Sequence, residues 1–209
     1  MKWVWTGGCF ALMIILYLIY ESIKWGSEEH KWQEWFFKGA ATGMAALLAG
    51  YGYFSRPSAA SLFILIGLGV CVAADVILDL HFFAGTAAFG LGHVCYCAAM
   101  LLSNKPGWIN LIVFILLAGG VCALYPQIRK LESGKSALLY LGYALLIGAM
   151  LALSIGPKPL LTLGAVLFVA SDAMLLFRIV KHIPSKSYDY LCLGCYYLAQ
   201  FLIAASTVF

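Results

Sequence analysis

Eight apolar runs, each about 20 residues long, fill most of this chain. A helix of that length crosses the roughly 30 Å hydrocarbon core of a bilayer. Since lipid offers no partner for backbone polar groups, such runs must form helices. We therefore expect an all-α, polytopic membrane protein, folded as a single transmembrane domain over residues 1–209. The predicted spans are residues 3–20, 36–54, 59–79, 83–102, 108–125, 136–153, 160–180 and 188–208.

Composition supports a membrane location over a soluble one. Hydrophobic residues make up 64% of the 209 positions and charged residues only 11%, whereas a soluble domain carries about 25% charged residues. The first run lacks a small-x-small cleavage site, which favours a retained helix over a cleaved signal peptide.

The basic residues divide unevenly between the two sides of the predicted membrane. Nine face the side of the first, third, fifth and seventh interhelical connections: Lys24, Lys31, Lys38, Arg129, Lys130, Lys135, Arg178, Lys181 and Lys186. Four share a side with both termini: Lys2, Arg56, Lys105 and Lys158. Because cytoplasmic loops carry the excess of Lys and Arg, we expect both termini on the non-cytoplasmic side.

The longest connection, residues 21–35, mixes charged residues with Trp25, Trp32 and Trp35. This mixture is typical of a short amphipathic helix lying at the lipid interface. A solvated loop is the alternative.

Two aspartates lie deep inside apolar runs with similar flanking residues. Asp75 follows Val72-Ala73-Ala74, and Asp172 follows Val169-Ala170-Ser171. A charged carboxylate at the centre of a membrane helix costs on the order of 2.5–3.5 kcal/mol even on the most lenient scale. A chain that bears this cost twice in similar contexts is expected to use both groups together. The alternative is that each aspartate only ties two helices together by hydrogen bonding.

The spacing of these aspartates suggests an internal repeat. They are 97 positions apart, in the third and seventh predicted helices. Four spans separate the two helices, so both cross the membrane in the same direction. This is the pattern of a parallel repeat of four plus four helices about a pseudo-twofold axis. It predicts that Asp75 and Asp172 lie at comparable depths and face each other.

Few other polar side chains lie within the spans. His93 and Tyr96 are three positions apart and share one helix face, and Gln200 needs a partner in the eighth helix. The simpler explanation is a helix-packing hydrogen bond for His93 and an amphipathic side chain that fills space for Tyr96. Asp79 lies near a helix end, where it can meet water. Possible hydrogen-bond partners are Tyr140, Tyr143, Tyr196 and Tyr197.

Several function classes find no support. The chain has no phosphate-binding glycine loop, no G-x-S-x-G nucleophile and no HExxH zinc motif. His93 and Cys97, like Cys192 and Cys195, have helical ligand spacing, but neither pair is a recognised zinc signature. We expect no metal, no cofactor and no nucleic-acid partner.

Two buried carboxyl groups suit two kinds of function. Burial disfavours the charged form, and a neighbouring carboxylate disfavours it further in one member, so one group can stay protonated while the other is ionised. This division suits acid-catalysed cleavage of an acetal or enol ether, in which the acid donates a proton and the carboxylate stabilises an oxocarbenium ion. It equally suits a proton-coupled transporter or a lipid-binding membrane protein.

Four short motifs in order resemble the lysoplasmalogenase (YhhN-like) family over most of the chain. They are Ala74-Asp75-x-x-Leu78, Phe89-x-x-x-His93-x-x-Tyr96, Leu167-Phe168-x-x-Ser171-Asp172-x-x-Leu175 and Tyr197-x-Ala199-Gln200-x-Leu202-Ile203. The chain departs from the family where Ala74 replaces a common Gly and where Lys38-Gly39 replaces a common Lys-Pro.

The resemblance implies an intramembrane hydrolase of lysoplasmalogens that releases a fatty aldehyde and glycerophosphoethanolamine or glycerophosphocholine. Asp75 and Asp172 are then the expected catalytic pair, and the substrate is a lysophospholipid drawn from membrane lipid. The expected supporting residues are His93, Tyr96, Gln200, Ser171 and Tyr197. The expected head-group contacts are Lys38, Arg178 and Lys181, whose alternative role is ordinary cytoplasmic-side charge.

Overall fold

The computed structural model describes residues 1–26, 31–131, 134–181 and 185–209. Within these residues the chain forms eight helices and no strand, which confirms the all-α prediction. The helices are α1 (Lys2–Lys24), α2 (Lys31–Ser55), α3 (Ala59–Leu80), α4 (Phe82–Ser103), α5 (Trp108–Leu131), α6 (Lys135–Ser154), α7 (Pro159–Lys181) and α8 (Lys186–Ala205).

The helices end where the sequence places polar and helix-breaking residues. Ser58 caps α3, and its hydroxyl accepts a hydrogen bond from the Ser61 backbone N–H at 3.1 Å. The Ser61 hydroxyl in turn accepts from the Ser58 backbone N–H at 3.2 Å, which completes a capping box. Pro57, just before this cap, cannot supply the N–H that would continue α2.

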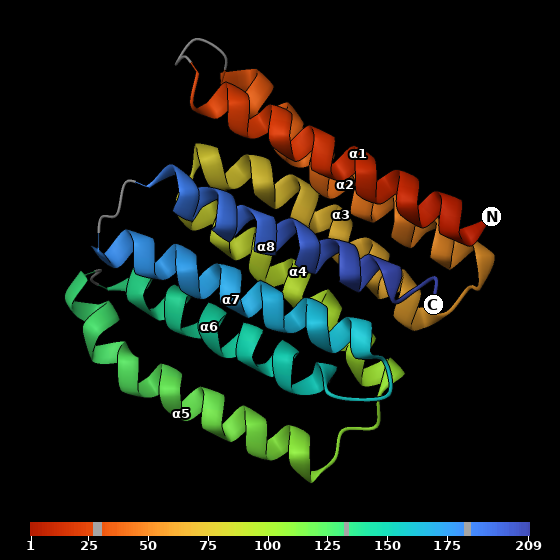
Figure 1. Ribbon diagram of the computed structural model, residues 1–209. Coiled ribbons are helices and arrows are strands. Elements are labelled where there is room, and N and C mark those ends of the chain that lie inside the picture. The colour runs from red at the N-terminus through yellow and green to blue at the C-terminus, as the bar shows by residue number, and fades with distance from the viewer. Residues whose placement is uncertain (27–30, 132–133, 182–184) are drawn as a thin grey trace.

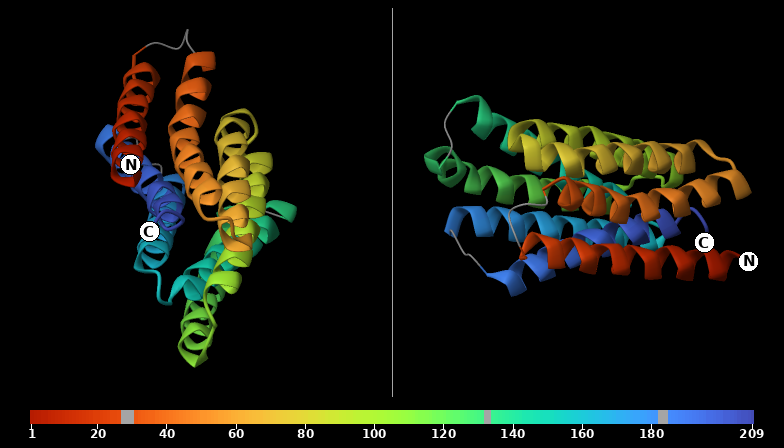
Figure 2. Two further views of the ribbon diagram at one scale, coloured as in Figure 1. Left: turned by 90° about the vertical axis from the view of Figure 1, so that its right-hand side faces the viewer. Right: turned by 90° about the horizontal axis from the view of Figure 1, so that it is seen from above.

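Six helices form a closed ring of neighbours in the order α2, α3, α4, α6, α7 and α8, and α1 and α5 pack outside it on α2 and α6. From top to bottom, Figure 1 shows α1, α2 and α3, then α8 with α4, then α7, α6 and α5. Figure 2 shows α1 and α5 at opposite extremes of the bundle.

The neighbours of each helix recur four helices later in the chain. The contacts α1–α2, α2–α3, α3–α4 and α2–α8 have counterparts in α5–α6, α6–α7, α7–α8 and α6–α4. A parallel repeat of four plus four helices predicts this arrangement. It brings α4 and α8 to the centre, between the two aspartate-bearing helices α3 and α7.

Six helices in the described part of the chain are long and apolar enough to cross a membrane: α1, α3, α4, α5, α6 and α7. The protein is therefore an integral multi-pass membrane protein, but the prediction of eight apolar spans is too high. The helices α2 and α8 are less apolar than the other six because they bury polar side chains inside the bundle. These include Lys38 and Thr42 of α2, and Asp189 and Gln200 of α8.

The predicted interfacial helix over residues 21–35 is wrong where the structure describes it. Residues 21–24 complete α1 and residues 31–35 begin α2, while residues 27–30 lie outside the described part of the chain. Trp25 lies just past α1, where its indole N–H donates to Glu21 Oε2 at 3.1 Å. The tryptophan therefore caps a long helix instead of anchoring a separate one.

Two glycines allow α3 and α4 to approach closely. A Cβ atom on Gly67 would lie 2.6 Å from the Tyr96 ring, and one on Gly92 would lie 2.8 Å from Cys71 Sγ. Because neither glycine has a side chain, the Tyr96 ring can lie flat against α3 in the interior of the bundle.

Candidate active site

Asp75 is enclosed by three helices near the carboxyl end of α3. Only 1% of its surface is exposed. Its Oδ2 atom accepts a hydrogen bond from the Thr42 hydroxyl of α2 at 2.5 Å and another from the Tyr196 hydroxyl of α8 at 2.9 Å. Two donors that converge on one carboxylate oxygen stabilise its ionised form.

Two further hydrogen bonds link Tyr196 to Gln200 and Gln200 to Tyr96. Gln200 Nε2 donates to the Tyr196 hydroxyl at 3.2 Å, and the Tyr96 hydroxyl donates to Gln200 Oε1 at 2.7 Å. Each donor therefore points along the chain from Tyr96 toward Asp75. Such a chain polarises its members cooperatively, which further stabilises negative charge on Asp75.

Asp172 has a sparser environment in α7. It is partly buried, and the Tyr143 hydroxyl of α6 donates to its Oδ2 atom at 2.6 Å. Tyr143 is the one hydroxyl donor to this carboxyl group among the described residues. The neighbouring Ser171 hydroxyl turns away and donates to the Cys192 carbonyl at 2.9 Å, which ties α7 to α8.

The two aspartates share one feature that follows the helix repeat. In each half, a hydroxyl of the second helix donates to the aspartate of the third: Thr42 of α2 to Asp75, and Tyr143 of α6 to Asp172. Each half therefore supplies its carboxyl group with a hydroxyl donor from the preceding helix, although Thr42 and Tyr143 are not at equivalent positions of the 97-residue spacing.

His93 is buried in α4, with one ring nitrogen free to accept a hydrogen bond. Its Nδ1 atom lies 2.7 Å from the Phe89 carbonyl oxygen. Since a carbonyl only accepts, Nδ1 carries the proton, and Nε2 of the neutral ring is an acceptor. Nε2 is buried and has no hydrogen-bond partner among the described residues. A buried acceptor without a partner is typical of a site that receives a water or ligand.

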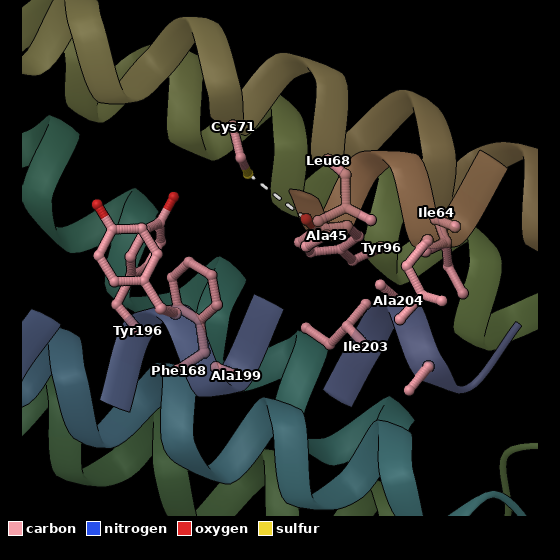
Figure 3. Close-up of a cluster of buried hydrophobic side chains, with 14 of the residues drawn as sticks. Ala45, Ile64, Leu68, Cys71, Tyr96, Phe168, Tyr196, Ala199, Ile203 and Ala204 are labelled. Carbon is pink, nitrogen blue, oxygen red and sulfur yellow. Dashed lines mark hydrogen bonds between the residues drawn. The ribbon is translucent and has the colours of Figure 1, made fainter. Parts of the chain in front are cut away.

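An aromatic cluster connects the two aspartate environments, and two of its members, Phe168 and Tyr196, are labelled in Figure 3. The His93 ring packs edge-on against Phe168 at 4.4 Å and Tyr143 at 5.5 Å between ring centroids. Phe168 in turn packs against Tyr196 at 5.5 Å. Rings thus lead from the tyrosine bound to Asp172 to the tyrosine bound to Asp75. The carboxyl groups border a common cluster but share no hydrogen-bond partner among the described residues.

Cys71 marks the α3 side of this cluster. Its Sγ atom is 3.6 Å from the Tyr96 hydroxyl, the contact drawn as a dashed line in Figure 3. Cys71 precedes Asp75 by one turn of α3, so the Tyr96 hydroxyl and the Asp75 carboxyl group lie along the same face of that helix.

The predicted head-group residues are engaged in ion pairs. Lys38 Nζ donates to Asp79 Oδ1 at 2.7 Å and is 5% exposed. Arg178 pairs with the buried Asp189, which also accepts from Lys24 at 3.1 Å. The side chain of Lys181 lies outside the described part of the structure.

Sequence reasoning found most of these side chains, although not all of their roles. Tyr143 and Tyr196 are hydrogen-bond partners of the aspartates, as expected, whereas Tyr197 donates to the Lys38 carbonyl at 3.3 Å. Thr42 was missed. Its only signal is its place four residues after Lys38, on the same face of α2.

Metal ligands do not converge in the described residues, where no three His, Cys, Asp or Glu side chains gather at one point. The cysteines of the two spaced pairs instead pack within the bundle, and the Cys192 thiol donates to the Ser171 carbonyl at 3.3 Å.

Comparison with known proteins gives one match. A family model described as the YhhN family matches residues 33–207, which includes all of the aspartate environments described above. No curated protein and no solved structure matches the chain.

Proposed function

The chain belongs to the YhhN family, which includes lysoplasmalogenases, and on this premise we propose that it hydrolyses the vinyl-ether bond of lysoplasmalogens. The products are a fatty aldehyde and glycerophosphoethanolamine or glycerophosphocholine. The observation that carries the proposal is the pair of hydroxyl-bonded aspartates, Asp75 and Asp172, inside a membrane bundle. In the proposed enzyme the six apolar helices cross the membrane, and the more polar α2 and α8 pack against them.

Hydrolysis of a vinyl ether needs a strong acid more than it needs a nucleophile. The acid transfers its proton to the outer vinyl carbon, and the double-bond electrons form the new C–H bond. The inner carbon and the ether oxygen then share the positive charge of an oxocarbenium ion. Water adds to the inner carbon and loses a proton to give a hemiacetal. The hemiacetal then breaks its bond to the glycerol oxygen, its hydroxyl group loses a proton to form the aldehyde, and the glycerol oxygen gains a proton. One vinyl ether and one water thus give one aldehyde and one alcohol.

Unequal hydrogen bonding assigns different roles to the two carboxyl groups in this proposal. Asp75 accepts from Thr42 and Tyr196, which stabilises the carboxylate, so Asp75 is the group that faces the oxocarbenium ion. Asp172 has one hydroxyl donor and remains protonated more readily, so it is the acid. After proton transfer, the Asp172 carboxylate takes back a proton from the attacking water.

His93 is the proposed positioning residue for that water. Its unpartnered Nε2 atom accepts a hydrogen bond from water, while the Phe89 carbonyl fixes the ring tautomer. His93 lies beside Tyr143, the donor to the proposed acid. The water is therefore held on the side of the group that must accept its proton. Tyr96 and Gln200 act through the chain that ends on Asp75.

The substrate head group is expected at the end of the bundle nearest the aspartates. Asp79 follows Asp75 by one helical turn, and its Lys38 partner is the nearest proposed phosphate contact. Arg178 and Lys181, near the end of α7, are the others. A phosphate at Lys38 would compete with Asp79 for the ammonium group.

Purified protein in detergent tests the proposal directly. Given lysoplasmenyl-ethanolamine, it should release fatty aldehyde, which mass spectrometry detects. Saturated-ether and acyl lysolipids run beside it should remain intact, because neither has a vinyl carbon to protonate. Glu34→Gln, which neutralises a carboxylate outside the cluster, should retain the rate. Absence of aldehyde from folded protein, together with proton-coupled uptake into vesicles, would instead identify a transporter.

A further inference from the structure

The end of the bundle that carries both termini has basic residues without acidic ones. Lys2, Arg56, Lys105 and Lys158 belong to this end. None of the nine acidic residues in the sequence lies in the α2–α3, α4–α5 or α6–α7 connections or beside either terminus. An anion at this end would therefore meet positive charge that no nearby Asp or Glu neutralises.

A cavity of about 350 Å³ opens at this end. It lies among the α2–α3 connection, the start of α7 and the residues after α8, near the labels N and C in Figure 1. Its lining includes Arg56, Ser58, Ser61, Ile64, Lys158 and Phe209. A smaller cavity of about 120 Å³ shares Arg56 and Thr207 with it and adds Lys2.

The two cations of the larger cavity are free to bind a ligand. Neither Arg56 nor Lys158 lies within ion-pair distance of a carboxylate among the described residues. This contrasts with Lys38, Arg178 and Lys24 at the opposite end, each of which pairs with an aspartate. Arginine binds phosphate oxygens through its planar fork, and lysine adds a second positive charge.

The rest of the lining is suited to an amphiphile. Ser58 and Ser61, which form the capping box, place the first turn of α3 in the lining, and the helix dipole there favours negative charge. Ile64 and Phe209 provide apolar walls. A ligand with a phosphate next to an apolar segment satisfies both parts of this lining.

We propose that this cavity is a second ligand site, which binds a phosphate-bearing ligand between Arg56 and Lys158. It is separate from the aspartate cluster. Ser61 and Asp75 lie 14 residues apart on α3, which corresponds to about 21 Å along the helix axis. A lysolipid whose vinyl ether lay at Asp75 would not place its phosphate here. The site therefore does not depend on the proposed reaction.

Binding to the purified full-length protein in nonionic detergent tests this site. The probes are dihexanoyl phosphatidic acid and inorganic phosphate, titrated separately by isothermal calorimetry. The variant is Arg56→Gln with Lys158→Gln, and the matched control is Lys105→Gln with Lys130→Gln, which removes the same charge from exposed positions outside the cavity. Loss of two charge-assisted contacts should weaken binding at least about tenfold in the first variant only.

The two probes distinguish the source of the phosphate. Binding of both with similar affinity identifies a free-phosphate site, and tighter binding of the lipid identifies a lipid head-group site. Wild-type affinity should also fall with added salt, because exposed charges are screened. Three outcomes would overturn the proposal. They are an affinity that does not change with salt concentration, no binding of either probe, and an equal loss of affinity in both double variants. Asp75→Asn should bind like the wild type, which separates this result from the outcome of the activity assay.

Discussion

The environments of Asp75 and Asp172 share a backbone plan and differ in their side chains. Both aspartates belong to the third helix of a four-helix half, and each accepts a hydrogen bond from a hydroxyl of the second helix. Asp75 has Tyr196 as a further donor, whereas Asp172 has Tyr143 alone among the described residues. A repeated backbone thus provides two carboxyl groups that differ in the number of their hydroxyl donors.

The two aspartates differ in their hydrogen bonding because of side chains on the central helices α4 and α8. Next to Asp75, α8 contributes Tyr196 and Gln200, which extend a chain of donors toward the carboxylate. On the other side, α4 contributes His93, whose Nε2 atom has no partner among the described residues. The Asp75 environment has several hydrogen-bond donors, whereas the Asp172 environment borders an acceptor without a partner among the described residues. The first environment suits a fixed charge, and the second suits proton transfer to and from a ligand.

The largest expected effect is loss of turnover on replacing either aspartate. Asp172→Asn should reduce kcat about 10⁴-fold, because a general acid contributes up to that factor. Asp75→Asn should reduce it by about 10²- to 10³-fold, as expected for loss of electrostatic stabilisation. Aldehyde release measured by mass spectrometry gives both values. The reverse order would exchange the two roles, and a near-normal rate in either variant would refute the paired mechanism.

Replacement of His93 should have the next largest effect. His93→Asn keeps a donor toward the Phe89 carbonyl and removes Nε2, so kcat should fall roughly 10²-fold from loss of the positioned water. His93→Gln, which places an acceptor farther from the backbone, should restore part of the rate. The unfolding midpoint should change little, because Nε2 has no hydrogen-bond partner among the described residues. Equal rates in the two variants would argue for a packing role only.

The donors to Asp75 should have a smaller effect. Tyr196→Phe removes one hydroxyl from the carboxylate and leaves the ring packing in place, so kcat should fall about tenfold, equivalent to about 1.4 kcal/mol. Tyr188→Phe is the matched control, since that hydroxyl donates to the Met174 carbonyl outside the cluster. An equal change of kcat in Tyr196→Phe and Tyr188→Phe would contradict the role assigned to the Tyr196 hydroxyl.

The smallest expected effect is on stability, through the packing that holds Tyr96. Gly67→Ala forces a methyl group against the Tyr96 ring and should lower the free energy of unfolding by about 1 kcal/mol. Gly69→Ala lies two positions away on α3, with no atom within 4 Å of the added carbon, and should be neutral. Thermal unfolding in detergent separates the two variants. Equal unfolding midpoints in the two variants would show that the Tyr96 ring moves aside without a cost in stability.

The sequence alone located the helices and singled out both aspartates because polarity inside an apolar run is a local signal. The spacing of 97 residues and four spans also led to the expectation of a repeat, with which the recurring helix contacts agree. It failed at Thr42, because a threonine in a membrane helix is common and its partner lies 33 positions away. It also treated Lys38 as free, whereas Asp79 neutralises it.

The chain by itself therefore determined that this is a multi-helix membrane protein with two carboxyl groups in its apolar interior. Length and apolarity of each run decide this, because the bilayer acts on each helix separately. Only the tertiary structure decided which hydroxyl meets which aspartate, which cations are paired, and why α2 and α8 carry more polar residues than the other helices. These facts depend on contacts between helices that are distant in sequence, and no single run encodes them.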